Sequence, residues 1–185
     1  MKLPNDENYR VIGEYDISAI KEEVLNLTEE DWNLDITRQN IFKGVHHMTQ
    51  CYFVMGFPLN WDGVGYPSER KTTKNRLYDS VKLISDQLEI YFNGRVGRAI
   101  FTKLVPRGTI PKHRDGGYYL MNSHRCHIPI ATNENILFHL QDKTINMETG
   151  TCYEINNYDS HAVENNSDQE RIHMIIDIIP MESFK

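Results

Sequence analysis

Residues 150–179 read GTCYEINNYDSHAVENNSDQERIHMIIDII, and this stretch decides the fold class. Three short runs rich in apolar and β-branched residues, 151–155, 161–164 and 171–179, alternate with turns rich in Asn, Asp and Ser. Such runs predict strands, and the polar residues between them predict tight turns. Because the runs recur at roughly ten-residue intervals, the pattern favours an antiparallel sandwich or a small barrel.

The same alternation of strands and turns begins after Gly94, whereas the first half of the chain is more helical. Further strands are predicted at 98–105, 124–131, 136–140 and 143–147, and in the first half at 9–15 and 47–55. Helices are predicted from residue 16 or 18 to 27, and from 73 to 92, where apolar residues recur every three or four positions. We therefore expect one mainly β domain, 1–185, in which residues 1–95 pack on the barrel and residues 96–180 form its core.

Composition narrows the function classes. The 185 residues carry a formal charge of −6 and are 39% apolar, so no nucleic-acid partner is expected. No apolar run is long enough for a bilayer, and the first ten residues lack the apolar stretch of a signal peptide. We expect a cytoplasmic protein without a membrane partner. Its three cysteines, Cys51, Cys126 and Cys152, fit no metal or redox spacing and are expected to be reduced thiols.

A candidate metal motif lies at His113 and Asp115. In an extended segment these two side chains project to the same side, so an imidazole and a carboxylate can reach one cation. Two His and one carboxylate on one face of an octahedral ion are typical of non-haem iron(II) oxygenases. Taken alone, this pair is equally compatible with a surface turn. His161 is the candidate third ligand, since no other His is followed ten residues later by Arg, here Arg171.

Three further polar residues are candidates for binding a cosubstrate. A guanidinium at Arg171 inside a barrel is unfavourable unless it meets a buried anion, and the distal carboxylate of 2-oxoglutarate would be such an anion. The alternative is an ion pair with a nearby acidic residue. Arg125 and His127 share one face of a predicted strand and are expected to face the cavity, the alternative being a solvated edge. His46, His47, His139 and His173 are interpreted as structural.

Together these motifs resemble the aspartyl/asparaginyl β-hydroxylase family of 2-oxoglutarate oxygenases. The resemblance runs from about Phe101 to Pro180 and rests on LVPRGTIPKHRD, RCHIPI and the 150–179 stretch in that order. It implies a double-stranded β-helix, or cupin-like jelly-roll barrel. It also implies His113 and His161 as iron ligands, Arg171 on 2-oxoglutarate, and Arg125 and His127 beside it. Animal members lack the acidic ligand, which Asp115 supplies here.

The predicted function is hydroxylation of a C–H bond in the side chain of an amino acid, peptide or protein, with Fe(II), 2-oxoglutarate and O2, releasing succinate and CO2. Desaturation shares the early steps. The alternatives are a cupin-type metal-dependent enzyme or a binding module that does not use 2-oxoglutarate, and zinc fits the same ligands. Residues 57–67, rich in Gly and Pro, are a candidate lid or an ordinary surface connection.

Overall fold

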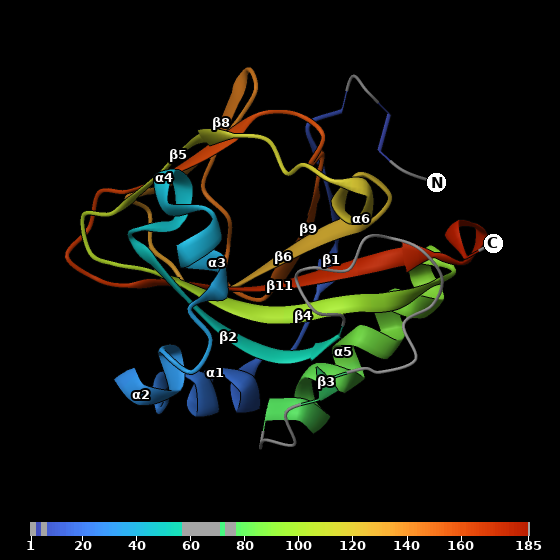
Figure 1. The fold of residues 1–185 in the computed structure, drawn as a ribbon, viewed down its shortest axis with the longest axis horizontal. Helices are drawn as coiled ribbons and strands as arrows, with labels where there is room; N and C mark the ends of the chain where they lie inside the picture. Colours follow the sequence, from blue (N-terminus) through green and yellow to red (C-terminus); the bar gives the residue numbers. More distant parts are fainter. Residues whose placement is uncertain (1–2, 5–6, 57–70, 73–76, 185) are drawn as a thin grey trace.

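The computed structural model describes residues 3–4, 7–56, 71–72 and 77–184, and its strands form two antiparallel sheets that face each other (Figure 1). The large sheet has the order β1-β9-β6-β11-β4-β2-β3, and the small sheet has the order β5-β10-β7-β8. This is the predicted jelly-roll barrel with flanking helices. The strands are β1 (Tyr9–Glu14), β2 (Thr49–Gly56), β3 (Lys71–Thr72), β4 (Gly94–Leu104), β5 (Thr109–His113), β6 (His124–Ala131), β7 (Ile136–Leu140), β8 (Lys143–Ile145), β9 (Thr151–Ile155), β10 (His161–Asn165) and β11 (Arg171–Pro180).

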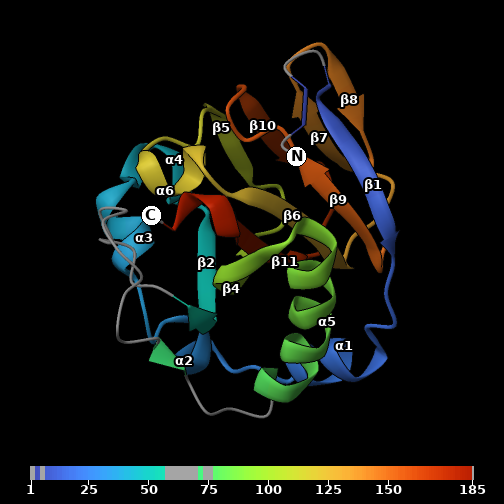
Figure 2. The same cartoon turned by 90° about the vertical axis from the view of Figure 1, so that its right-hand side faces the viewer.

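The helices occupy two different places. α1 and α5 pack beneath the large sheet, on the face turned away from the small sheet (Figure 2). α3 and α4 lie at the opening between the sheets, where α3 contacts β2 and α4 contacts β5 (Figure 1). Within the described residues, no helix is long and apolar enough to cross a bilayer. The helices are α1 (Ser18–Leu25), α2 (Glu29–Trp32), α3 (Thr37–Ile41), α4 (Lys43–His46), α5 (Leu77–Phe92) and α6 (Tyr118–Met121), with a 3-10 turn, η1, at Met181–Ser183.

The main hydrophobic core lies between the large sheet and helices α1 and α5. Ile128 and Ile130 of β6 and Met174 of β11 are buried there, together with Val81 and Leu88 of the predicted apolar stripe on α5. All three cysteines are free and buried, as expected. The main core therefore lies on one face of the large sheet. The other face lines the space between the sheets, where a smaller cluster joins Leu104 and Ile155 to Phe138 and Val163 of the small sheet.

Several predicted boundaries are corrected by the structure. β4 starts at Gly94 rather than at residue 98, because the long strand β11 pairs with it as far as Pro180 opposite Gly94. A Cβ at Gly94 would lie 2.5 Å from the carbonyl oxygen of Ile179, so this close approach requires glycine. β2 starts at Thr49 rather than 47, because His46 ends helix α4. Residues 73–76 of the predicted second helix lie outside the described residues.

The sequence did not predict the short helices α2, α3, α4 and α6. Each has only four or five residues, which is too short to show helical periodicity. α2 does carry a local signal, since Thr28 and Asp31 form a capping box at its start. α3 and α4 carry none that we recognise, and these two helices complete one wall of the cavity between the sheets.

Candidate active site

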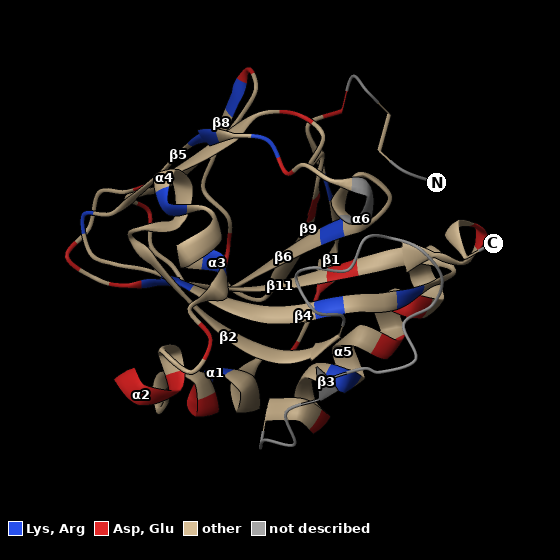
Figure 3. Cartoon of the chain, viewed as in Figure 1, with Lys and Arg blue, Asp and Glu red and all other residues tan. Residues whose placement is uncertain are grey.

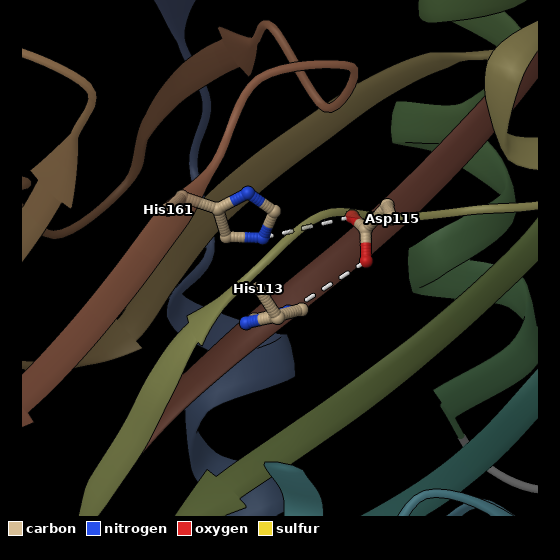
Figure 4. A group of neighbouring side chains, drawn as sticks. All are labelled: His113, Asp115 and His161. Atoms are coloured by element: carbon tan, nitrogen blue, oxygen red, sulfur yellow. Dashed lines mark ion pairs between the residues drawn. The ribbon is translucent and has the colours of Figure 1, made fainter.

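The three candidate metal ligands converge because of strand register. His113 ends β5, His161 begins β10, and the antiparallel pairing sets them directly opposite each other. Opposite residues of neighbouring strands project to the same face, so the two rings lie 4.3 Å apart between centroids. Asp115 follows beyond the end of β5, and its carboxylate points back toward both rings (Figure 4). Its Oδ1 lies 3.8 Å from Nε2 of His113, and its Oδ2 lies 3.7 Å from Nε2 of His161.

Backbone carbonyls fix the tautomer of both imidazoles. Nδ1 of His113 lies 2.9 Å from the carbonyl oxygen of Pro111, and Nδ1 of His161 lies 3.2 Å from that of Asp159. A carbonyl oxygen only accepts, so each Nδ1 carries the proton and donates it. In the neutral rings the lone pair is then on Nε2, which faces Asp115. Burial, acting as the largest influence, lowers the pKa of His161 and keeps its ring neutral.

A buried row of charges holds Asp115 in place. Nη1 of Arg125 donates a hydrogen bond to Oδ2 of Asp115 at 2.8 Å. Nε and Nη2 of the same guanidinium donate to Oδ1 and Oδ2 of Asp177 at 2.8 and 2.9 Å. Asp177 is paired in register with Arg125 on one side and Arg98 on the other, forming the row visible across β6, β11 and β4 (Figure 3). Burial alone would raise the pKa of Asp115, but Arg125, His161 and His113 outweigh it and lower that pKa well below its usual range.

Arg171 is a buried cation that pairs with no carboxylate of the described residues. Its side chain is among the largest fully buried ones, and Nη2 donates to Nδ1 of His173 at 2.7 Å. Among the described residues no acidic group pairs with it, and its Nε has no hydrogen-bond partner. Burial, together with the charge of Arg38, lowers the pKa of Arg171 to about 9. Burying a guanidinium without a paired anion is energetically unfavourable.

The same cavity collects these groups in one space of about 340 Å³. His127 faces it, as predicted, with both ring nitrogens buried and unpartnered, and burial holds its pKa well below the usual value. The hydroxyl of Thr102 is likewise buried without a partner. The lining consists of Arg38, His46, Thr102, Ile110, His113, Asp115, Arg125, His127, Phe138, His161, Val163, Arg171 and Ile175.

Two polar lining residues from the first half of the chain were not predicted from the sequence. Arg38 comes from α3 and His46 from α4, both in the first half of the chain. The His46 ring packs edge-on against the His113 ring at 5.6 Å, and burial, then the charge of Arg38, lowers its pKa to about 2. No motif or spacing in the sequence marks either residue. Their place depends on how α3 and α4 fold over the opening.

The remaining predictions for individual residues have mixed outcomes. His173 is a buried histidine that accepts a hydrogen bond from Arg171, as the structural interpretation expected. His139 bonds Thr144 on the neighbouring strand. The candidate lid at 57–67 lies outside the described residues.

A family model describing aspartyl/asparaginyl β-hydroxylases matches residues 14–180. The chain belongs to this family. The match confirms the resemblance seen in residues 101–180 and extends it through most of the first half of the chain, where the sequence analysis found none. The predicted enzyme class, a hydroxylase, is that of the family.

The hydroxylase also shares its fold with solved oxygenases. A 2OG-Fe(II) oxygenase from Burkholderia pseudomallei is 13% identical with a TM-score of 0.51, over 71% of this chain and 66% of the other. A prolyl-4-hydroxylase from Pseudomonas putida is 10% identical with a TM-score of 0.57, over 95% and 94%. A Trichoplax adhaerens prolyl hydroxylase, solved with a hypoxia-inducible-factor peptide, is 10% identical with a TM-score of 0.58, over 97% and 86%. No curated protein matches the sequence.

The residues of this hydroxylase fit iron(II) and 2-oxoglutarate. Two imidazoles and one carboxylate offer ligand atoms that all lie within 4.8 Å of one another, which is the donor set of non-haem iron(II) oxygenases. A dicarboxylic cosubstrate would also supply the anion that Arg171 lacks. Zinc accepts the same donors, but zinc alone gives no role to the buried guanidinium.

Proposed function

We propose that His113, Asp115 and His161 bind iron(II), and that this family member uses it with 2-oxoglutarate to hydroxylate a C–H bond in the side chain of an amino acid, peptide or protein. One observation carries the proposal. The three ligands meet in a cavity that also holds Arg171, a buried cation with no carboxylate among the described residues. A metal site and an adjoining anion site are what a metal-chelated dicarboxylate needs.

When bound, iron(II), 2-oxoglutarate and dioxygen together supply the oxidant, and the cosubstrate leaves as succinate and CO2. The protein binds and orients these groups. The guanidinium of Arg171 would hold the distal carboxylate of 2-oxoglutarate through charge-assisted hydrogen bonds. Thr102 and His127, whose polar atoms are buried and have no hydrogen-bond partner, would donate hydrogen bonds to the same cosubstrate.

Arg125 is assigned a positioning role. Its strand position predicts a place beside the cosubstrate, and Arg125 lines the cavity. Its guanidinium is nevertheless engaged with Asp115 and Asp177. By donating to one carboxylate oxygen of Asp115, Arg125 orients the acidic ligand and keeps it ionised, as outer partners of metal ligands commonly do.

Anaerobic titration tests the proposal directly. The metal-free protein is loaded with iron(II) and titrated with 2-oxoglutarate, and we expect the visible absorption band of an iron-bound 2-keto acid. Succinate release is then screened over free amino acids and peptides, with mass detection of a sixteen-dalton gain, the added mass of one oxygen atom. An unchanged spectrum would favour a cupin-type metal enzyme or a binding module without 2-oxoglutarate. Activity with zinc in place of iron would overturn the choice of metal.

A further inference from the structure

We propose that Arg38 of α3 binds a carboxylate of the primary substrate, and so selects substrates that carry a free carboxylate. This inference rests on the proposed function, because it assigns the substrate side of the same site. Arg38 lies on helix α3, outside the motifs in residues 101–180 that carry the family resemblance. It is therefore a specificity-determining residue supplied by the first half of the chain.

The position of Arg38 links two adjoining cavities. It lines the cavity of the metal ligands, and it also lines a second cavity of about 260 Å³. The second cavity has apolar walls formed by Phe53 and Ile100. Its complete lining is Asp35, Arg38, Cys51, Phe53, Arg98 and Ile100. A substrate carboxylate bound at Arg38 would therefore lie between the second cavity and the metal ligands.

Arg38 lacks the anion that a guanidinium in this position requires. Its side chain is only partly exposed, and its Nη1 is buried without a hydrogen-bond partner. No described carboxylate forms an ion pair with it, including Asp35, whose Oδ1 accepts from the backbone N–H of Thr37. Burial lowers the pKa of Arg38 to about 10, and the charges of Arg125 and Arg98 contribute to this shift. The unmet need is for a negative charge that the described part of the chain does not provide.

The cosubstrate would not meet this need, because its charges are used elsewhere in the site. One of its carboxylates would face iron(II), and the distal carboxylate would face Arg171. Among the described carboxylates, Asp115 and Asp177 are both engaged by Arg125, and Asp177 is also engaged by Arg98. A substrate carboxylate would supply the negative charge that the described residues do not offer to Arg38.

A carboxylate at this place has two possible chemical sources. It is either the α-carboxylate of a free amino acid or the side-chain carboxylate of an acidic residue within a peptide. Both present the planar, bidentate partner that a guanidinium prefers. The proposal concerns this shared chemistry, and the test separates the sources.

The test compares acids with their amides in binding to the wild type and to Arg38→Gln. Both proteins are loaded with manganese(II), which does not turn over, and with 2-oxoglutarate. They are then titrated calorimetrically with the L-amino acids, their α-amides, and C-terminally amidated peptides containing Asp or Asn. We expect at least one acid to bind the wild type at least about tenfold more tightly than its amide, the size of one charge-assisted hydrogen bond. Preference for free amino acids identifies the α-carboxylate, and preference for Asp over Asn peptides identifies the acidic side group.

In Arg38→Gln the preference for acids over amides should disappear, and Arg38→Lys should retain part of it. The affinity of Arg38→Gln for 2-oxoglutarate should stay within about twofold of the wild type, because that anion pairs with Arg171. Arg107→Gln, which alters an exposed arginine paired with Asp168, is the matched control and should change neither affinity. Thermal unfolding confirms that each variant is folded. The proposal is overturned if no acid is preferred, if the preference survives in Arg38→Gln, or if 2-oxoglutarate binding weakens with it. Failure of the iron and 2-oxoglutarate absorption band in the wild type is a separate result that removes the proposed function.

Discussion

The two faces of the large sheet are built from the same strands and have opposite chemistry. On the outer face, Phe101, Ile128 and Met174 pack against α1 and α5 in the main hydrophobic core. On the inner face, the adjacent positions of the same strands carry Thr102, His127 and His173. Both faces are buried, so burial alone does not distinguish them. On the outer face, the buried polar side chains of His124 and Lys103 have partners in Glu154 and Glu29. On the inner face, Thr102, His127 and His173 hold polar atoms without partners.

This difference teaches where function lies in the barrel. Burying polar and charged groups is unfavourable, and the inner face therefore lowers the stability of the protein alone. Ligands that bind the metal residues, Arg171 and Arg38 would remove that penalty. We expect substitutions on the outer face to change folding, and substitutions on the inner face to change binding and turnover.

The largest effect is expected for Asp115→Ala. Removal of the acidic ligand should reduce succinate formation by at least about hundredfold, since changes even to the outer partners of metal ligands cost up to that much. The unfolding midpoint should change little. Succinate release and urea unfolding measure the two quantities, and Asp168→Ala, at an exposed ion pair, is the control. Full activity in Asp115→Ala would mean that the acidic ligand is dispensable.

On the outer face, Phe101→Ala should destabilise the fold by about 3–5 kcal/mol, because it opens a cavity in a fully buried cluster. Thr102→Val is the matched substitution one residue further along the sequence and on the opposite face. Its hydroxyl has no partner, so this change should be neutral or slightly stabilising. Chemical denaturation measures both. Equal losses of stability would contradict the contrast between the faces.

Arg171→Met should weaken 2-oxoglutarate binding by at least about tenfold, the effect of losing a charge-assisted contact. Stability of the ligand-free protein should not fall, because an apolar side chain of similar length replaces a buried unpaired cation. Calorimetry and thermal unfolding test the two parts. A strongly destabilised variant with unchanged 2-oxoglutarate affinity would assign Arg171 to the core and remove its cosubstrate role.

The smallest effect is expected on the pH dependence of folding. Burial keeps the pKa of His127 and His173 well below their usual value in the folded state, whereas in the unfolded state they titrate near about 6.5. As pH falls below about 6.5, only the unfolded state takes up these protons, so stability falls with pH. Each histidine contributes up to about 1.4 kcal/mol per pH unit. His127→Leu should flatten the slope by that share, measured by urea unfolding of the metal-free protein, and an unchanged slope would contradict neutral burial.

Sequence reasoning predicted the residues on the C-terminal strands more completely than those on the first half. His113, Asp115 and His161 were selected from their spacing and from Arg171, and the structure brings these side chains into one cavity. Strand alternation placed Arg125 and His127 on the same wall. The partners of Arg125 were not predictable, because Asp177 lies on a different strand and joins it only through strand pairing.

The sequence by itself determined the periodic strands, the apolar stripe of α5 and the family motifs, since these depend on residues close together along it. Only the tertiary structure decided that His161 stands opposite His113, and that α3 and α4 bring Arg38 and His46 to the cavity. The physical reason is the distance along the sequence over which each interaction acts. Local propensity acts over a few neighbouring residues, whereas strand register and helix packing bring together residues that are distant in the sequence.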